Sequence, residues 1–398
     1  MEEKRALVYP YTDEFTPLFR YWKGFGKYNI THLVLPAGFG LTGKDAAEAD
    51  LSSPLGKLIE DDFEAALADV DTVIIADPGG YFVTKREGPW DGTQTLPRAV
   101  IAKMKLAMER GKDIVCLMEF QDEMEEDLRK AAIELQVTIS FLGDMEDKVF
   151  LKRVLQKKDK APKKIPIPVI FVMGMGENTD KYLVQLGLRQ RLAELGLNVG
   201  WVGSRRYTEL LGGHSLPSFL NDLRYTEVQK IELFNHFVHE VAQEGAKDVV
   251  IVGVPGGVLP YNRQIHNQYG RTAYLMTQAV IPDYTVFTAY CFEKIEEWVL
   301  QGMVDAVKFR CNSGLDAVHV SRFDMDMNKT QELKVVHYHR YAQGAVDTLV
   351  QAYRTFFPNT FNVHHDDELR RLLDAVVEEL SGDTHAEVMN ERGAMEHV

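Results

Sequence analysis

The sequence predicts an α/β protein made of two parallel-sheet domains. Short apolar runs alternate with amphipathic segments along most of the 398 residues, as expected for parallel strands connected by helices. A stretch rich in Lys and Pro at 157–168 separates two such series and is typical of a linker. Residues 167–206 then follow the order strand, glycine-bearing loop, helix, strand, which is the frame of a phosphate-binding loop.

Residues 1–155 are expected to form a Rossmann-like domain. Its five predicted strands are short apolar runs, at 6–9, 32–35, 72–76, 113–118 and 137–142. Helical segments at 98–110 and 125–135 lie between them. The loops at 10–17, 36–45 and 77–81 follow strands at their carboxyl ends, where open α/β sheets bind ligands.

One of these loops contains a glycine pattern. Gly38, Gly40 and Gly43 fit G-x-G-x-x-G, the fingerprint of a dinucleotide-binding turn. A lone match of this kind is also what a glycine-rich turn between two elements produces. A turn is the simpler interpretation, and the nucleotide interpretation stays open.

The loop at 174–181 carries the lysine of a P-loop but lacks two other parts. P-loops hold phosphate with backbone N–H groups and a lysine, and hold Mg²⁺ with a Ser or Thr hydroxyl. Lys181 is in place, whereas Asp180 stands where glycine is expected and Tyr182 stands where the hydroxyl is expected. Three interpretations remain: an inactive relic of an NTPase fold, a site for another anion, and a site of nucleotide turnover.

Further candidates lie at the same predicted sheet edge. Arg205 and Arg206 follow the strand at 199–202, where they would contact phosphate or, alternatively, pair with carboxylates of this acidic protein. The strand at 248–254 lacks an aspartate for Mg²⁺ at its carboxyl end, which argues against hydrolysis. The candidate ligand-binding residues are Gly174, Gly176, Asn178, Lys181, Ser204, Arg205, Arg206, Gly256 and Gly257. The sequence identifies no catalytic residue.

The rest of the second domain, 169–363, offers metal-ligand types without a decisive pattern. Strands are expected at 283–290 and 305–310, a helix at 292–301, and a hairpin at 318–340. On the hairpin, Asp324 and Asp326 share one face, as do His337 and His339. The helix at 226–244 also carries His and Glu at helical spacing. Solvated polar faces explain both patterns equally well.

Helices are expected at 342–356 and 364–380, and a disordered tail at 381–398. The predicted organisation is therefore a domain at 1–155, a linker at 156–168, a degenerate P-loop domain at 169–363, and a charged helix with a tail at 364–398.

Composition restricts the function classes. A net charge of −14 argues against nonspecific nucleic-acid binding, which requires a basic surface. The three cysteines, none at C-x-x-C spacing, indicate a reducing compartment and argue against a cysteine-only metal site. The start MEEKRALVYPY is not a signal sequence, and no run approaches the roughly 20 apolar residues of a membrane span. We expect a cytoplasmic protein, with a homodimer as the default assembly.

Several segments resemble a family of peptide maturation system proteins. They are ALVYPYTDEFTPLFR, LPAGFGLTGKDAAEAD, GMGENTDKYLVQLGLRQRL, VGSRRYTELLGGHSLPSF, EVQKIELFNHF and DVVIVGVPGG. The resemblance implies a role in a bacterial gene cluster for a ribosomally made, bacteriocin-type natural product (RiPP). It implies a precursor peptide, a radical-SAM maturase and an acyl-carrier-related protein as partners, but no particular reaction. Residues 168–310 are more distantly similar to dethiobiotin-synthetase-like P-loop proteins, through Gly174 and Lys181.

From these observations we expect an accessory protein of peptide maturation. It would bind the precursor peptide or the partner maturase and contain a P-loop-like core that does not turn over nucleotide. One alternative is a pathway enzyme that binds a nucleotide or other phosphate ligand and modifies the peptide. Another is a metal-dependent protein that uses the hairpin at 318–340. Whether the chain is an enzyme stays open.

Overall fold

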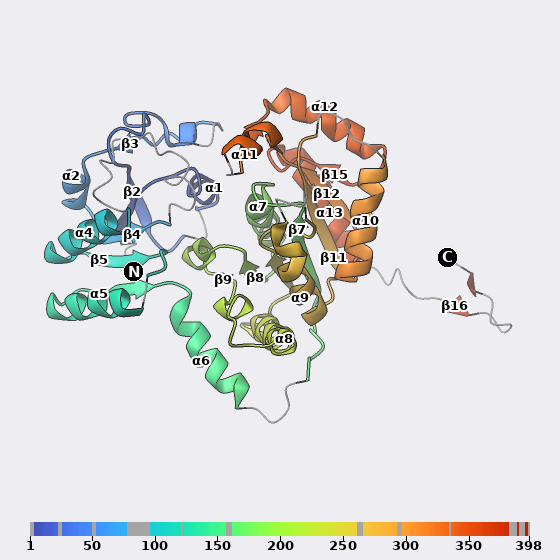
Figure 1. Ribbon diagram of the computed structural model, residues 1–398, viewed down its shortest axis with the longest axis horizontal. Coiled ribbons are helices and arrows are strands. Elements are labelled where there is room, and N and C mark those ends of the chain that lie inside the picture. Colours follow the sequence, from blue (N-terminus) through green and yellow to red (C-terminus); the bar gives the residue numbers. More distant parts are fainter. Residues whose placement is uncertain are drawn as a thin grey trace. The chain divides into compact units, whose positions relative to one another are not determined.

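The chain forms two compact units (Figure 1). The first unit contains Met1–Lys160 and Trp201–Thr226, and the second contains Ala161–Gly200 and Glu227–Val398. The computed structural model describes residues 4–22, 26–49, 53–77, 96–120, 122–156, 161–260, 266–292, 297–333, 336–381, 388–389 and 395–396. The segment 201–226 therefore groups with the first unit, although the sequence places it within the second predicted domain and its strands pair in the sheet of the second unit.

The first unit contains a six-stranded parallel sheet in the order β3-β2-β1-β4-β5-β6. Its strands are β1 (Arg5–Tyr9), β2 (Asn29–Val34), β3 (Ile59–Glu60), β4 (Thr72–Ile75), β5 (Asp113–Cys116) and β6 (Ile139–Phe141). This is the Rossmann strand order, and the connection reverses direction between β1 and β4. The Rossmann-like sheet predicted from the alternation of strands and helices is confirmed.

The helices of the first unit present one apolar face each. They are α1 (Thr16–Arg20), α2 (Phe63–Leu67), α4 (Leu96–Glu109), α5 (Asp122–Glu134) and α6 (Asp144–Leu155). In α4, Val100, Met104 and Ala107 are buried at spacings of three and four, so this stripe packs into the core under the sheet. The start of α2 is fixed by Asp62, whose carboxylate accepts a 2.9 Å hydrogen bond from the Ala65 N–H.

The other sheet has seven strands in the order β15-β12-β11-β7-β10-β8-β9, again parallel. The strands are β7 (Val169–Gly174), β8 (Val199–Gly203), β9 (His214–Ser215), β10 (Val249–Gly253), β11 (Tyr284–Ala289), β12 (Ala317–Val320) and β15 (Thr360–Phe361). Every residue of β7, β10 and β11 is buried. A parallel sheet covered on both faces requires such continuous apolar runs, which is why they were visible in the sequence.

Six helices of the second unit flank these strands. They are α7 (Lys181–Glu194), α8 (Glu227–Gln243), α9 (Arg271–Ala279), α10 (Glu297–Cys311), α12 (Gln343–Arg354) and α13 (Asp366–Ser381). Residues 181–188 of α7 are all buried, because α7 contacts both β7 and α13. The first two turns of α7 are thus enclosed on every side.

Two predicted elements differ in the structure. Residues 305–310 belong to helix α10 rather than to a strand, because the buried Leu300, Met303 and Val307 follow helical spacing. The hairpin predicted at 318–340 is also wrong in part. Strand β12 joins the parallel sheet, while β13 (Phe323–Met325) pairs with β14 (Tyr338–Arg340) across a helix, α11 (Met327–Leu333).

The linker and the tail fall partly outside the described residues. Residues 157–160 are among those not described, and 161–168 form no helix or strand. Within that stretch, the Lys163 N–H donates to Asn235 Oδ1 at 2.6 Å, and the Lys163 carbonyl accepts from Asn235 Nδ2 at 2.9 Å. This part of the linker is therefore fixed to α8. In the tail, two short segments, Val388–Met389 and Met395–Glu396, pair as antiparallel strands.

Candidate functional site

The candidate site lies at the carboxyl end of β7, between its neighbours β10 and β11. Strand β7 ends at Gly174, the loop covers 175–180, and α7 begins at Lys181. A central strand that leads through a short loop into a helix directs the loop's backbone and the helix N-terminus toward one point. This is the position that the sequence predicted for a phosphate-binding loop.

Two glycines allow this loop to approach β11 closely. A Cβ atom on Gly174 would lie 2.1 Å from Thr288 Oγ1, and one on Gly176 would lie 2.3 Å from the Tyr290 hydroxyl oxygen. Both distances are far below van der Waals contact, so any side chain here would displace the loop. Asn178 adopts a left-handed φ of 53°, which Asn tolerates better than most residues.

Lys181 is enclosed within the loop. Its side chain is buried, and its amine donates to the Gly176 carbonyl and, at 3.3 Å, to Thr179 Oγ1. Burial lowers the pKa of Lys181, although the nearby charges of Glu177 and Asp180 oppose the shift. The structure thus holds the amine of Lys181 at the end of the central strand.

Asp180 occupies the glycine position in a left-handed conformation, with φ of 60°. Its carboxylate lies 3.4 Å from His319 Nε2 and 3.4 Å from the Arg322 backbone nitrogen, which donates to it. The Val363 N–H donates to His319 Nδ1 at 3.3 Å, which leaves Nε2 as the proton-bearing nitrogen that faces Asp180. The aspartate is therefore bound by groups at the end of β12.

These contacts determine the protonation state of Asp180. Burial alone would raise its pKa, but the hydrogen bond from His319 and the charges of neighbouring histidine and arginine side chains outweigh burial. The pKa of Asp180 consequently lies well below its ordinary value. Because its negative charge is compensated locally, Asp180 repels an anion in the loop less than the sequence suggested.

The two described positions at which a P-loop protein holds Mg²⁺ carry other groups in this chain. Tyr182, buried at the second position of α7, replaces the small hydroxyl. At the end of β10, a Cβ on Gly253 would lie 2.1 Å from Gln185 Oε1, so a buried glutamine fills the space beside that strand. The aspartate missing from the sequence of β10 is not replaced by one from α7.

The glycine turn after β10 lies against the loop. A Cβ on Gly257 would lie 2.3 Å from the Met175 carbonyl oxygen, and Gly256 has a φ of +71°, so both positions require glycine. Asn267, which the sequence did not indicate, donates from Nδ2 to the same Met175 carbonyl at 3.1 Å and to the Leu259 carbonyl at 2.8 Å. The turn and Asn267 therefore fix the first half of the loop.

The remaining candidates, Ser204, Arg205 and Arg206, directly follow β8. Arg205 forms an ion pair with Glu14, and Arg206 pairs with Glu119 at 2.5 Å and donates to the Leu142 carbonyl at 3.3 Å. Burial lowers the pKa of Arg205. These contacts match the alternative in which the arginines bind carboxylates of the protein itself. Ser204, in the same turn, follows β8, a strand that β10 separates from β7 in the same sheet.

The metal and dinucleotide patterns are not supported by geometry. Among the described residues, no group of three or more His, Cys, Asp and Glu side chains is placed to hold a metal ion. On the hairpin, His339 Nε2 pairs with Asp326 at 3.1 Å instead. The glycines of the G-x-G-x-x-G pattern, Gly38, Gly40 and Gly43, have φ of 97°, 72° and 77°, after β2 rather than β1. They form a turn.

No family model matches this chain, and no curated protein matches it either. Solved structures of other proteins are similar to it, and two of these follow. A DUF1611 family protein from Anabaena variabilis has a TM-score of 0.59 at 11% identity, covering 95% of this chain and 99% of that one. A nucleotide-binding protein from Archaeoglobus fulgidus, in complex with ADP, has a TM-score of 0.31 at 14% identity, covering 59% and 93%.

The DUF1611 protein shows that the two-unit α/β fold recurs over nearly the full length of another chain. At this identity the likeness concerns the fold alone. No helix in the described part of the chain is long and apolar enough to cross a membrane.

Proposed function

We propose that the second unit binds an anionic ligand of the phosphate class at the loop between β7 and α7, without Mg²⁺-dependent turnover. The supporting observation is the buried amine of Lys181, which the loop itself holds at the start of α7. A lysine and a helix N-terminus that converge on one point attract an anion. Either a nucleotide or a simpler phosphate ester satisfies this chemistry.

The compensation of Asp180 supports anion binding at a loop that lacks the usual glycine. His319 and the Arg322 N–H bind the carboxylate, so its charge is directed toward β12. Tyr182 is enclosed and position 253 is a glycine, so neither position offers a Mg²⁺ ligand. This supports the part of the proposal that excludes Mg²⁺-dependent turnover.

Calorimetry with phosphate, pyrophosphate, ADP and ATP tests the proposal. We expect binding of at least one of these anions, equal with and without Mg²⁺, and lost in Lys181→Ala. Lys308→Ala is the matched control, because it removes an exposed positive charge from α10 of the same unit. Equal loss in both variants, or ATP hydrolysis that requires Mg²⁺ and Lys181, would refute the proposal.

A role in peptide maturation is a second proposal, and it rests on the sequence segments that resemble that family. There the protein would act as an accessory factor that binds the precursor peptide, the radical-SAM maturase or the acyl-carrier-related protein. Co-purification with these neighbours, and the mass of the precursor peptide produced with and without this chain, tests it. An unchanged peptide mass together with no co-purification would contradict this role.

A further inference from the structure

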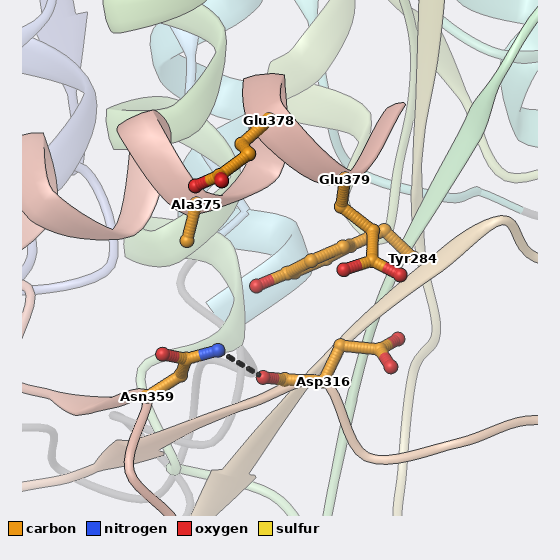
Figure 2. Close-up of a pocket in the computed structure, with 6 residues that line it drawn as sticks. All are labelled: Tyr284, Asp316, Asn359, Ala375, Glu378 and Glu379. Carbon is orange, nitrogen blue, oxygen red and sulfur yellow. Dashed lines mark hydrogen bonds between the residues drawn. The ribbon is translucent and has the colours of Figure 1, made fainter. Parts of the chain in front are cut away.

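A pocket of about 360 Å³ lies where β11, β12 and β15 begin, beside the end of α13 (Figure 2). Asp316 accepts a hydrogen bond from the Thr285 N–H at 2.6 Å, and Asn359 donates to the Asp316 carbonyl at 3.1 Å. Glu378 and Glu379, which line the pocket from α13, are exposed. The polar groups of this pocket therefore join the starts of three strands, and its acidic side is open surface.

Helix α10 has a buried face and, opposite it, an exposed aromatic face. Leu300, Met303 and Val307 are buried at spacings of three and four. On the opposite face, Trp298 is 74% exposed and Phe309 is 79% exposed. These two positions are separated by about three helical turns, so they lie on one line along the helix. The α10 stripe, as we call this line, consists of Trp298, Gly302, Asp305 and Phe309.

The composition of the α10 stripe is typical of an interface. Trp and Phe are enriched at protein–protein interfaces relative to the rest of the protein surface. Between them, a Cβ atom built on Gly302 would meet no heavy atom within 4 Å. No described contact of this chain therefore requires glycine here, although glycine destabilises a helix interior relative to alanine. A glycine on an exposed helix face does allow the backbone of a second helix to approach closely.

The exposed aromatic surface continues beyond α10. Arg310 Nη2 donates to the Tyr269 carbonyl at 2.5 Å, which places Tyr269 beside the last turn of α10. Tyr269 is 63% exposed, and Tyr274 of α9, a helix that contacts α10, is 44% exposed. In a symmetric pair of chains these two rings and those of Trp298 and Phe309 each occur twice. At about 150–250 Å² for a full ring, their exposed parts supply about 800–1,300 Å² of buried surface, comparable with the roughly 1,000 Å² that a specific interface needs.

The charges at the ends of α10 suit an antiparallel partner. Glu297 in the first turn and Lys308 in the last turn are exposed and again about three turns apart, so both border the α10 stripe on the same side. Lys308 Nζ lies 5.9 Å from the centroid of the Phe309 ring. A two-fold axis that crosses the helix near Gly302 would bring Glu297 of one copy to Lys308 of the other. It would likewise place Trp298 against Phe309, whereas a parallel pair would bring like charges together.

We propose that the α10 stripe is the contact between two copies of this chain, packed antiparallel about a two-fold axis. Each end of the interface then holds an aromatic pair and an ion pair, and the two backbones approach at Gly302. A second copy suits the stripe better than an unrelated partner, because the stripe supplies both members of every pair, as an isologous interface requires. The inference does not depend on the anion-binding proposal, since no residue of α10 is part of that site.

Sedimentation velocity of the full chain measures the association. We expect a dimer with twice the chain mass of 45.2 kDa. Trp298→Ala should weaken it at least about 100-fold, through a tenfold loss at each of two symmetric contacts. The matched control is Ile133→Ala, which shortens a 76% exposed apolar side chain on α5 of the first unit and should leave the dimer unchanged. Circular dichroism confirms that each variant is folded.

Charge exchange tests the antiparallel register. Glu297→Lys and Lys308→Glu should each weaken the dimer about fivefold at low salt. The double variant should recover most of this loss, because each ion pair re-forms with reversed sign. The helix dipole disfavours both exchanges, so recovery in the double variant reports the partner chain and not the helix itself. Asp305→Asn should instead tighten the dimer, because Asp305 lies near the axis and so faces its own copy across it.

A chain that remains monomeric at about 100 μM, where a micromolar dimer is mostly associated, would overturn the proposal. A dimer that Trp298→Ala leaves intact would do the same, since association would then use another surface. Equal weakening by Ile133→Ala would show that the loss is not specific to α10. A double charge variant weaker than both single variants would refute the antiparallel arrangement.

Discussion

Replacing Asp180 by Asn tests the pairing that places an aspartate at the start of α7. Asn tolerates the left-handed φ of 60°, so the backbone strain is nearly unchanged, and the main loss is the negative charge that faces His319. The side chain of Asp180 is 13% exposed and that of His319 is fully buried, so solvent screens the pair little. The Asn oxygen still accepts these hydrogen bonds, so the loss is the difference between a charged and a neutral hydrogen bond, about 1 kcal/mol. We expect Asp180→Asn to lower the unfolding free energy by that amount at neutral pH.

The pKa shift of Asp180 determines how the destabilisation by Asp180→Asn changes with pH. The pKa of Asp180 in the folded chain lies below its unfolded value of about 3.9. A carboxyl group of this kind contributes stability that is fully present above the unfolded pKa and is lost as the pH falls toward the folded pKa. The difference between wild type and Asp180→Asn should therefore be largest near neutral pH and should shrink below about pH 4.

Urea unfolding followed by circular dichroism measures the free energies, and hydrogen exchange of the α7 amides assigns the change to this helix. The control is Asp374→Asn, which removes an exposed carboxylate from α13. The reasoning fails if the destabilisation persists undiminished in acid, or if the control variant reproduces it.

Three further predictions concern packing and burial. Gly174→Ala should destabilise the protein by about 1–3 kcal/mol in urea, because the new Cβ would lie 2.1 Å from Thr288 Oγ1; unchanged stability would contradict the described loop. Arg205→Ala should cost only about 1 kcal/mol, since Arg205 and Glu14 are 32% and 28% exposed; thermal unfolding measures this. Burial raises the thiol pKa of two cysteines to about 12, so the native chain should react slowly with DTNB at neutral pH and the denatured chain rapidly. A fast native thiol would refute the burial of Cys116 and Cys291.

The two parallel sheets could be predicted because their central strands are uninterrupted apolar runs that end in turns. Strand β7, for example, is VIFVMG, and all six residues are buried. The second half of helix α10 was missed because DAVKFR alternates over six residues like a strand. Its helical spacing becomes visible only when Leu300 and Cys311 are included, beyond that window.

The candidate site could be predicted only where it is local in the chain. Gly174, Lys181 and Tyr182 lie within nine residues, so their order alone indicates a modified P-loop. The partner of Asp180 is His319, 139 residues away, and no spacing rule connects them. Arg205 illustrates the same limit, since only the fold shows that its carboxylate partner is Glu14.

The segment 201–226 has a consequence for attempts to divide the protein. The chain leaves the first unit after Lys160, returns at Trp201, and leaves again after Thr226, so the backbone passes between the units three times. Phe219, which stacks on Phe150 of α6 at 6.1 Å, shows that the returning segment contributes to the first unit's core. A fragment cut at the linker would remove this segment from residues 1–160 and expose its apolar side chains on the other fragment. Gene fusions or truncations should therefore treat residues 4–381 as one indivisible piece.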